Sequence, residues 1–338
     1  MTIIFGSLFS GIGGFDLGFE RSGMRCAWQC EIDVAARTVL TKQFGKPIIE
    51  DVRNVRRDNV AAIDLVCGGF PCQDLSVAGK RAGLAGERSG LWFEFRRVVE
   101  ELGPKWVVTE NVRGLLSSNG GADFAAILRG LVELRYGVAW RILDAQYFGV
   151  AQRRRRVFIV GSLGDGRAAQ VLFESEGLFG NPPARQEAGA SPAPTLRAEF
   201  ERNRGLGQES EIDALVISQS LGSHHGRNDL DSMGAYIFEP RYARNGRGSP
   251  DIIAPPLKAE NGQTGKGDGA PVVAYKQSNQ VPAVGVRRLT PTECERLQGF
   301  PDGWTAGQSD SARYRQLGNA VAVPVIEWIG RRLMAVRP

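Results

Sequence analysis

Cys72 stands on a short rigid segment, Gly-Gly-Phe-Pro-Cys-Gln at 68–73, just after an apolar run that predicts a strand over 63–67. A thiol on an exposed loop is a candidate nucleophile, whereas a thiol inside a strand behaves as a small apolar residue. Ligands of open α/β sheets bind at the carboxyl ends of the strands. The sequence therefore favours Cys72 as a nucleophile and places Cys67 in the core.

A carboxylate and two arginines follow at other predicted strand ends. Glu110 closes the apolar run 106–110, and four consecutive arginines at 153–156 precede another apolar run. Alternate side chains of an extended segment share a face, so Arg154 and Arg156 can both point inward. The other two arginines are expected to face solvent or phosphate.

A glycine loop after the first predicted strand contains Phe9, Gly11 and Gly13. Glycines between a strand and a helix let the backbone approach a ligand closely. Glu31 ends the second predicted strand and Asp51 follows where a third should end, and carboxylates there can accept ribose hydroxyls. Together these residues predict a cofactor that contains adenosine. The spacing departs from G-x-G-x-x-G, which disfavours a nicotinamide dehydrogenase.

Apolar runs alternate with helical patterns through the first half of the chain. The predicted strands are 3–9, 24–30, 63–67, 106–110, 138–143 and 157–161, and two of the predicted helices are 34–44 and 92–102. Such alternation predicts an α/β fold with a mostly parallel sheet covered on both faces. The capping box that begins at Thr290 starts another helix, and a last apolar helix over 323–334 is expected to pack back on the first domain.

Composition changes over 172–285, which holds 10 of the 17 prolines and 15 of the 43 glycines. We therefore expect three segments: a catalytic and cofactor-binding domain at 1–171, a smaller loop-rich β-containing domain at 172–285, and a return to the first domain at 286–338. The similar segments 193–199 and 254–260, each followed by an apolar strand, suggest a duplicated β-unit. Chance similarity in a biased sequence is the alternative.

Charge and cysteine content limit the class of protein. The formal net charge is +5, but 172–285 carries 11 Lys and Arg against 14 Asp and Glu, so the basic excess lies outside it. This balance favours a polyanionic partner only mildly. Five loosely spaced cysteines and two adjacent histidines predict a reduced, intracellular, cytoplasmic protein without a metal site. Neither a membrane span nor an obvious oligomer interface is apparent, so we expect a monomer.

The order of these motifs resembles the DNA (cytosine-5)-methyltransferases of bacteria and phages. The resemblance rests on Phe-x-Gly-x-Gly-Gly, Gly-Gly-Phe-Pro-Cys-Gln, Glu-Asn-Val, Gln-x-Arg-x-Arg, Leu-Gln-Gly-Phe-Pro and Gln-Leu-Gly-Asn-Ala-Val, and it covers most of 1–160 and 286–326. It implies a Rossmann-like core that binds S-adenosyl-L-methionine, with a target recognition domain at 172–285. It also implies a reaction on carbon 5 of a cytosine flipped out of duplex DNA, as in restriction-modification systems.

The resemblance also implies roles for single residues. Cys72 would add to carbon 6 of the base, a protonated Glu110 would hydrogen-bond ring nitrogen 3, and Arg156, supported by Arg154, would hold the exocyclic oxygen. The implied cofactor pocket consists of Phe9, Gly11, Gly13, Glu31, Ile32, Asp51, Val52, Leu91 and Asn319. Two departures stand out: Glu50-Asp51-Val52 replaces the usual Gly-Asp-Ile, and the expected recognition domain is acidic.

Two other functions stay open on the sequence. A branch of the same family methylates cytosine in transfer RNA with these core motifs. A non-catalytic DNA-binding homologue is the second alternative, which the intact set of Cys72, Glu110 and the arginines disfavours.

Overall fold

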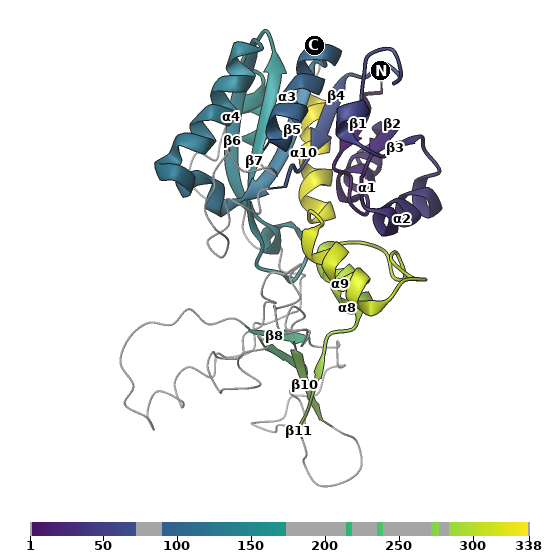
Figure 1. The fold of residues 1–338 in the computed structure, drawn as a ribbon. Coiled ribbons are helices and arrows are strands. Elements are labelled where there is room, and N and C mark those ends of the chain that lie inside the picture. The colour runs from purple at the N-terminus through teal and green to yellow at the C-terminus, as the bar shows by residue number, and fades with distance from the viewer. Residues whose placement is uncertain are drawn as a thin grey trace, which may run out of the picture.

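Two β-sheets organise the chain in the computed structural model, which describes residues 2–71, 90–173, 214–217, 235–238, 272–276 and 284–336. A seven-stranded sheet with helices on its faces forms the larger part, and a four-stranded sheet lies beyond α8 and α9 (Figure 1). This arrangement agrees with the predicted α/β core.

The larger sheet has the strand order β3-β2-β1-β4-β5-β7-β6. Its strands are β1 (Ile4–Leu8), β2 (Arg25–Cys30), β3 (Ile48–Ile49), β4 (Leu65–Gly68), β5 (Trp106–Val112), β6 (Tyr136–Asp144) and β7 (Arg155–Leu163). Neighbours from β3 to β5 pair in parallel, whereas β7 runs antiparallel to both β5 and β6. The parallel strands therefore bring their carboxyl ends to one edge, the edge at which open α/β sheets bind ligands.

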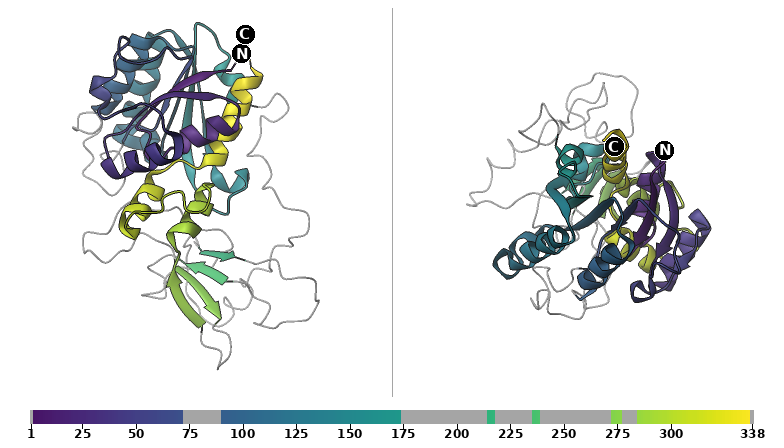
Figure 2. Two further views of the ribbon diagram at one scale, coloured as in Figure 1. Left: turned by 90° about the vertical axis from the view of Figure 1, so that its right-hand side faces the viewer. Right: turned by 90° about the horizontal axis from the view of Figure 1, so that it is seen from above.

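Helices cover both faces of this sheet (Figure 2). The helices of the described residues are α1 (Gly14–Arg21), α2 (Val34–Phe44), α3 (Leu91–Leu102), α4 (Ala122–Glu133), α5 (Ala168–Leu172), α8 (Pro291–Gln298), α9 (Asp310–Asn319) and α10 (Val323–Ala335), with 3-10 turns η1 (Val52–Asn54), η4 (Arg113–Gly121) and η5 (Ala145–Phe148). One buried cluster joins the sheet to α1, α5 and α10, and another joins it to α3 and α4. A third, smaller cluster packs α2 against α8 and α9.

The C-terminal helix α10 returns to the beginning of the chain and packs on α1. The contact is close because a Cβ at Gly18 would lie 2.6 Å from Ile326 Cβ, and a Cβ at Gly330 would lie 2.3 Å from Ser22 Oγ. The expected return of the last segment to the first domain is thus present. The helix predicted to start with a capping box is also present, since Thr290 and Glu293 cap α8 reciprocally.

The smaller sheet has the order β11-β10-β9-β8 and is antiparallel throughout. Its strands are β8 (Ala214–Ile217), β9 (Ala235–Phe238), β10 (Val272–Lys276) and β11 (Val284–Arg288). Both strands of the suggested duplication, β8 and β10, belong to it, but the segments 193–199 and 254–260 lie outside the described residues. The duplication and the domain boundaries therefore stay hypotheses.

No helix in the described part of the chain is long and apolar enough to cross a membrane.

Candidate active site

The loop after β1 is built from left-handed backbone. Phe9, Gly11 and Gly13 have φ of +52°, +56° and +85°, a region that is costly for residues with a side chain. Gly13 also has no room for a side chain, because a Cβ there would lie 2.4 Å from the ring of Phe44. The loop thus turns tightly. Its glycines are explained by the positive φ angles of the backbone and by the close packing of Phe44.

A buried polar network lies beneath this loop. Asp16 is fully buried, and its carboxylate accepts hydrogen bonds from Ser7 Oγ at 3.1 Å and Gln29 Nε2 at 2.8 Å. Ser10 Oγ in turn donates to Ser7 Oγ at 3.0 Å. Burial raises the pKa of Asp16 to about 6, because the charged form loses its hydration. The sequence motif gave no sign of this network.

Glu31 closes the loop from the neighbouring strand β2. Its Oε2 accepts the N–H of Gly11 at 2.7 Å and its Oε1 accepts the N–H of Asp33 at 2.8 Å. Burial raises the pKa of Glu31, and these backbone bonds oppose the rise. Each carboxylate oxygen has a further lone pair, so Glu31 can accept the hydroxyls of a ligand as well.

Beyond Glu31 the wall of the pocket is partly apolar. Asp51 caps η1 and pairs with Arg53, whose guanidinium lowers the pKa of that carboxylate. Ile32 lines the pocket and is 68% exposed. Val52 and Leu91 complete this wall.

Glu110 and Arg156 face each other at the other end of the pocket. They extend from the paired strands β5 and β7, and Arg156 Nε lies 3.0 Å from Glu110 Oε1. The N–H is not aimed along the N–O line, so the contact is an ion pair rather than a hydrogen bond. Gly69 permits this arrangement, since a Cβ there would lie 3.1 Å from Glu110 Oε2.

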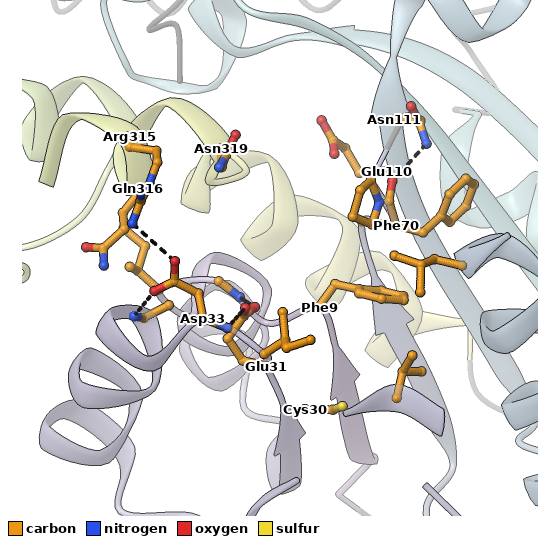
Figure 3. A pocket seen from close by; sticks show the side chains of 18 of the residues that line it. Phe9, Cys30, Glu31, Asp33, Phe70, Glu110, Asn111, Arg315, Gln316 and Asn319 are labelled. Carbon is orange, nitrogen blue, oxygen red and sulfur yellow. Dashed lines mark hydrogen bonds and ion pairs between the residues drawn. The ribbon is translucent and has the colours of Figure 1, made fainter. Parts of the chain in front are cut away.

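The segment that leads to Cys72 is fastened to β5. Thr109 Oγ1 donates to the carbonyl of Gly68 at 2.7 Å. Asn111 Nδ2 donates to the carbonyl of Phe70 at 3.4 Å (Figure 3). Pro71 lines the pocket directly before Cys72. Cys72 itself lies outside the described residues, whereas Cys67 is fully buried in β4, as predicted for a core thiol.

Arg154 is buried and turns toward the junction of α9 and α10. Its Nη2 donates to the carbonyls of Gly318 at 3.1 Å and Ala320 at 2.8 Å. Burial lowers the pKa of Arg154 to about 9. Asn319 lies between these two acceptors and lines the pocket.

One pocket of about 530 Å³ brings most of the predicted site residues together. It is lined by Phe9, Gly11, Glu31, Ile32, Asp51, Val52, Leu91, Glu110, Arg154, Arg156 and Asn319. Gly13 is not among the lining residues, and its place is explained by Phe44. The volume is that of a typical site for a small ligand or cofactor.

Comparison with known proteins gives the family. The model of the family described as C-5 cytosine-specific DNA methylase matches residues 3–335. The chain belongs to this family.

Several curated relatives span most of this methylase. Type II methyltransferase M.DsaV of Dactylococcopsis salina is 30% identical over 97% of this chain and 85% of its own length. M.Bsp6I of a Bacillus species is 32% identical over 97% of each chain. The solved structure of Schizosaccharomyces pombe Dnmt2 methyltransferase covers 100% of both chains with a TM-score of 0.61 at 18% identity, which supports the fold.

The methylase pocket also contains residues that sequence motifs did not single out. Asp33 and Arg315 meet across the pocket at 3.2 Å, and Gln316 lies beside them (Figure 3). Asp33 caps α2 through the N–H of Ala36, and this N-cap pattern was the available signal for it. No sequence signal pointed to Arg315, because its partner Asp33 lies near the opposite end of the chain. The described residues contain no group of His, Cys, Asp and Glu arranged to hold a metal ion.

Proposed function

We propose that this methylase transfers a methyl group from S-adenosyl-L-methionine to carbon 5 of a flipped-out cytosine in a short duplex DNA sequence. One observation carries the proposal. A single pocket has a hydroxyl-accepting end at Glu31 and an ion-paired end at Glu110 and Arg156, and the segment leading to Cys72 is fastened to β5 beside Glu110.

The cofactor end fits S-adenosyl-L-methionine. Glu31 is held by two backbone N–H groups and keeps lone pairs for ribose hydroxyls, while Phe9, Val52 and Leu91 offer apolar surface to an adenine. When bound, the cofactor supplies an electrophilic methyl group. Asp51 and Asn319 lie on the same wall and can accept or donate further hydrogen bonds.

The other end fits a cytosine. Arg156 can donate to the exocyclic oxygen, with Arg154 in support, and Glu110 in its protonated form can donate to ring nitrogen 3. Both interactions limit the negative charge on the ring when the Cys72 thiolate adds to carbon 6. The addition makes carbon 5 nucleophilic, so that it would take the methyl group from the cofactor, which would leave as S-adenosyl-L-homocysteine. Loss of the carbon 5 proton to water and expulsion of the thiolate would then restore the aromatic, methylated base.

A base stacked in a duplex cannot present carbons 5 and 6 to groups above and below its ring. Extrusion of the base costs a few kcal/mol, which contacts in the pocket and along the DNA must offset. We infer that the four-stranded sheet and the residues around it form the target recognition domain. The candidate arginines there, Arg227, Arg241, Arg244 and Arg247, lie outside the described residues.

Methyl transfer from labelled cofactor to mixed-sequence duplex DNA tests the proposal, with Cys72→Ala beside Cys67→Ala as a matched thiol control. We expect wild type and Cys67→Ala to label carbon 5 of cytosine in one short motif, and Cys72→Ala to label nothing. Duplex containing 5-fluorocytosine should trap a covalent complex with wild type, because fluorine cannot leave as a proton does. Labelling of transfer RNA but not DNA would support the transfer RNA alternative, and a silent wild type that still binds DNA would support the binding homologue.

A further inference from the structure

The turn between α9 and α10 is held from two sides by buried side chains. Gln298, the last residue of α8, donates through Nε2 to the carbonyls of Leu317 at 2.7 Å and Ala320 at 3.3 Å. Arg154 donates to the carbonyls of Gly318 and Ala320. Four hydrogen bonds thus fix the backbone on both sides of Asn319, whose side chain faces the pocket (Figure 3).

Gln298 does not line the pocket, and its side-chain amide donates hydrogen bonds but accepts none. The residue is fully buried, and its Oε1 is buried without a hydrogen-bond partner. A flipped amide would point Oε1 at two carbonyl oxygens, so the bonds fix its orientation. An unpaired buried acceptor costs stability, and a position that served packing alone would favour an apolar side chain. The two hydrogen bonds that Nε2 donates therefore offset the cost of the unpaired Oε1, and they explain why a glutamine occupies this position.

The position of Gln298 links distant parts of the methylase. Only Leu289 and Thr290 separate β11 of the four-stranded sheet from α8, which ends at Gln298. On the other side, Arg154 leads into β7, which carries Arg156. The turn that presents Asn319 is therefore held between the helix that leaves the smaller sheet and the strand that serves the base end of the pocket.

We propose that Gln298 is a positioning residue that, together with Arg154, sets Asn319 for cofactor binding. The proposal rests on the proposed binding of S-adenosyl-L-methionine. Without the Nε2 donors, the carbonyls of Leu317 and Ala320 lose a shared partner, and the end of α9 has fewer partners to hold it in place. Asn319 then no longer occupies a single position, and cofactor affinity falls although no group that faces the pocket has been removed.

The test compares Gln298→Met, Asn319→Ala and the double variant by calorimetric titration with S-adenosyl-L-methionine. Met keeps the length and burial of Gln without its donors. We expect each single variant to raise Kd about tenfold, equivalent to one or two lost hydrogen bonds. The double variant should match Asn319→Ala alone, because Gln298 acts through Asn319.

A matched control removes a comparable bond elsewhere. Gln43 Nε2 donates to the carbonyl of Trp304 at 2.8 Å. This bond also joins a glutamine side chain to the backbone of the C-terminal segment, but it is not made to the turn between α9 and α10. Gln43→Met should bind cofactor as wild type does. Equal Kd values for Gln298→Met and wild type, or effects of Gln298→Met and Asn319→Ala that multiply, would overturn the proposal.

Gln298→Glu gives a second readout that a general loss of stability would not produce. A buried carboxyl has a raised pKa, and only its protonated form can donate to a carbonyl. Cofactor affinity of this variant should therefore rise as pH falls from about 8 to about 6, beyond any change in wild type. A flat difference from wild type across that range would contradict the proposal. Failure of wild type itself to bind the cofactor would instead reject the proposed function.

Discussion

The two ends of the pocket lie at one sheet edge but are assembled differently. At the cofactor end, backbone N–H groups hold Glu31, and Phe9, Glu31, Asp51 and Val52 come from one short stretch of chain. Leu91 and Asn319 join this end from more distant parts of the sequence. At the base end, side chains of β5 and β7 pair with each other, and Arg154 reaches the turn before α10. The first end depends mainly on local chain geometry, to which the fold adds Asn319, whereas the second depends throughout on strands and helices brought together by the whole fold.

Glu110→Gln should cause the largest functional loss, and it tests whether the two ends of the pocket act separately. We expect it to lower the single-turnover rate of methyl transfer about 10²- to 10³-fold, because a preorganised group that stabilises the transition state is altered. The Kd for the cofactor should change less than about twofold, since Glu110 lies at the other end. Single-turnover assays with saturating DNA and cofactor measure the rate, and Glu133→Gln, at the surface on α4, serves as the control. Equal losses in rate and cofactor affinity would break the division between the two ends.

Asp16→Asn tests the buried carboxylate beneath the cofactor end. The pKa of Asp16 is raised from 3.8 to about 6 in the folded protein, so ionisation of this group favours the unfolded chain. Its cost is absent below pH 4, grows between pH 4 and 6, and amounts to about 3 kcal/mol at neutral pH. The free energy of unfolding of wild type should therefore fall over this range by that much from Asp16 alone. Denaturant titrations at several pH values should show that Asp16→Asn lacks this component, and identical pH profiles would refute the assignment.

Glu31→Gln tests the same separation of the two ends by altering the cofactor end. The amide cannot accept both backbone N–H bonds, so we expect the Kd for S-adenosyl-L-methionine to rise about 10- to 100-fold. The methyl-transfer rate at saturating cofactor should change little, because the base end is intact. Titration calorimetry and steady-state kinetics separate the two effects. A large loss of rate with unchanged affinity would place Glu31 in the chemistry instead.

The smallest effect is expected at the ion pair between Asp33 and Arg315. Both side chains are about half exposed, at 40% and 50%, and surface pairs contribute little. Arg315→Gln should raise the cofactor Kd at most about threefold at low salt. The difference should vanish near 1 M salt, where exposed charges are screened. A larger effect that persists in salt would mean that Arg315 contacts the ligand directly.

The same division explains what the sequence could predict. Every strand predicted over 3–161 is present within two residues at each end, and the helices at 34–44 and 92–102 were predicted closely, because each follows a local apolar pattern. The reversal of β7 was not predicted, since direction in a sheet depends on which strands become neighbours. The short helices α5 and α9 were also missed.

The pocket shows a similar limit. Phe9, Glu31 and Glu110 could be found at strand ends, but the pairing of Asp33 with Arg315 joins residues from opposite ends of the chain. Gly13 was assigned to the pocket because a motif does not distinguish a glycine that faces a ligand from one that makes room for Phe44. The hydrogen-bond network at Asp16 could not be predicted either, because a single aspartate in a helical pattern normally predicts a solvent-facing position.

The packing of α10 on α1 has a consequence for how the protein is made. The partners of Gly18 and Phe19, Ile326 and Gly330, are synthesised about 300 residues after them, which takes about 15 to 60 s at ordinary rates of translation. During that interval the apolar face of α1 lacks its cover, and the nascent chain is exposed to aggregation and to chaperones. The folded enzyme therefore forms only after the last helix has left the ribosome.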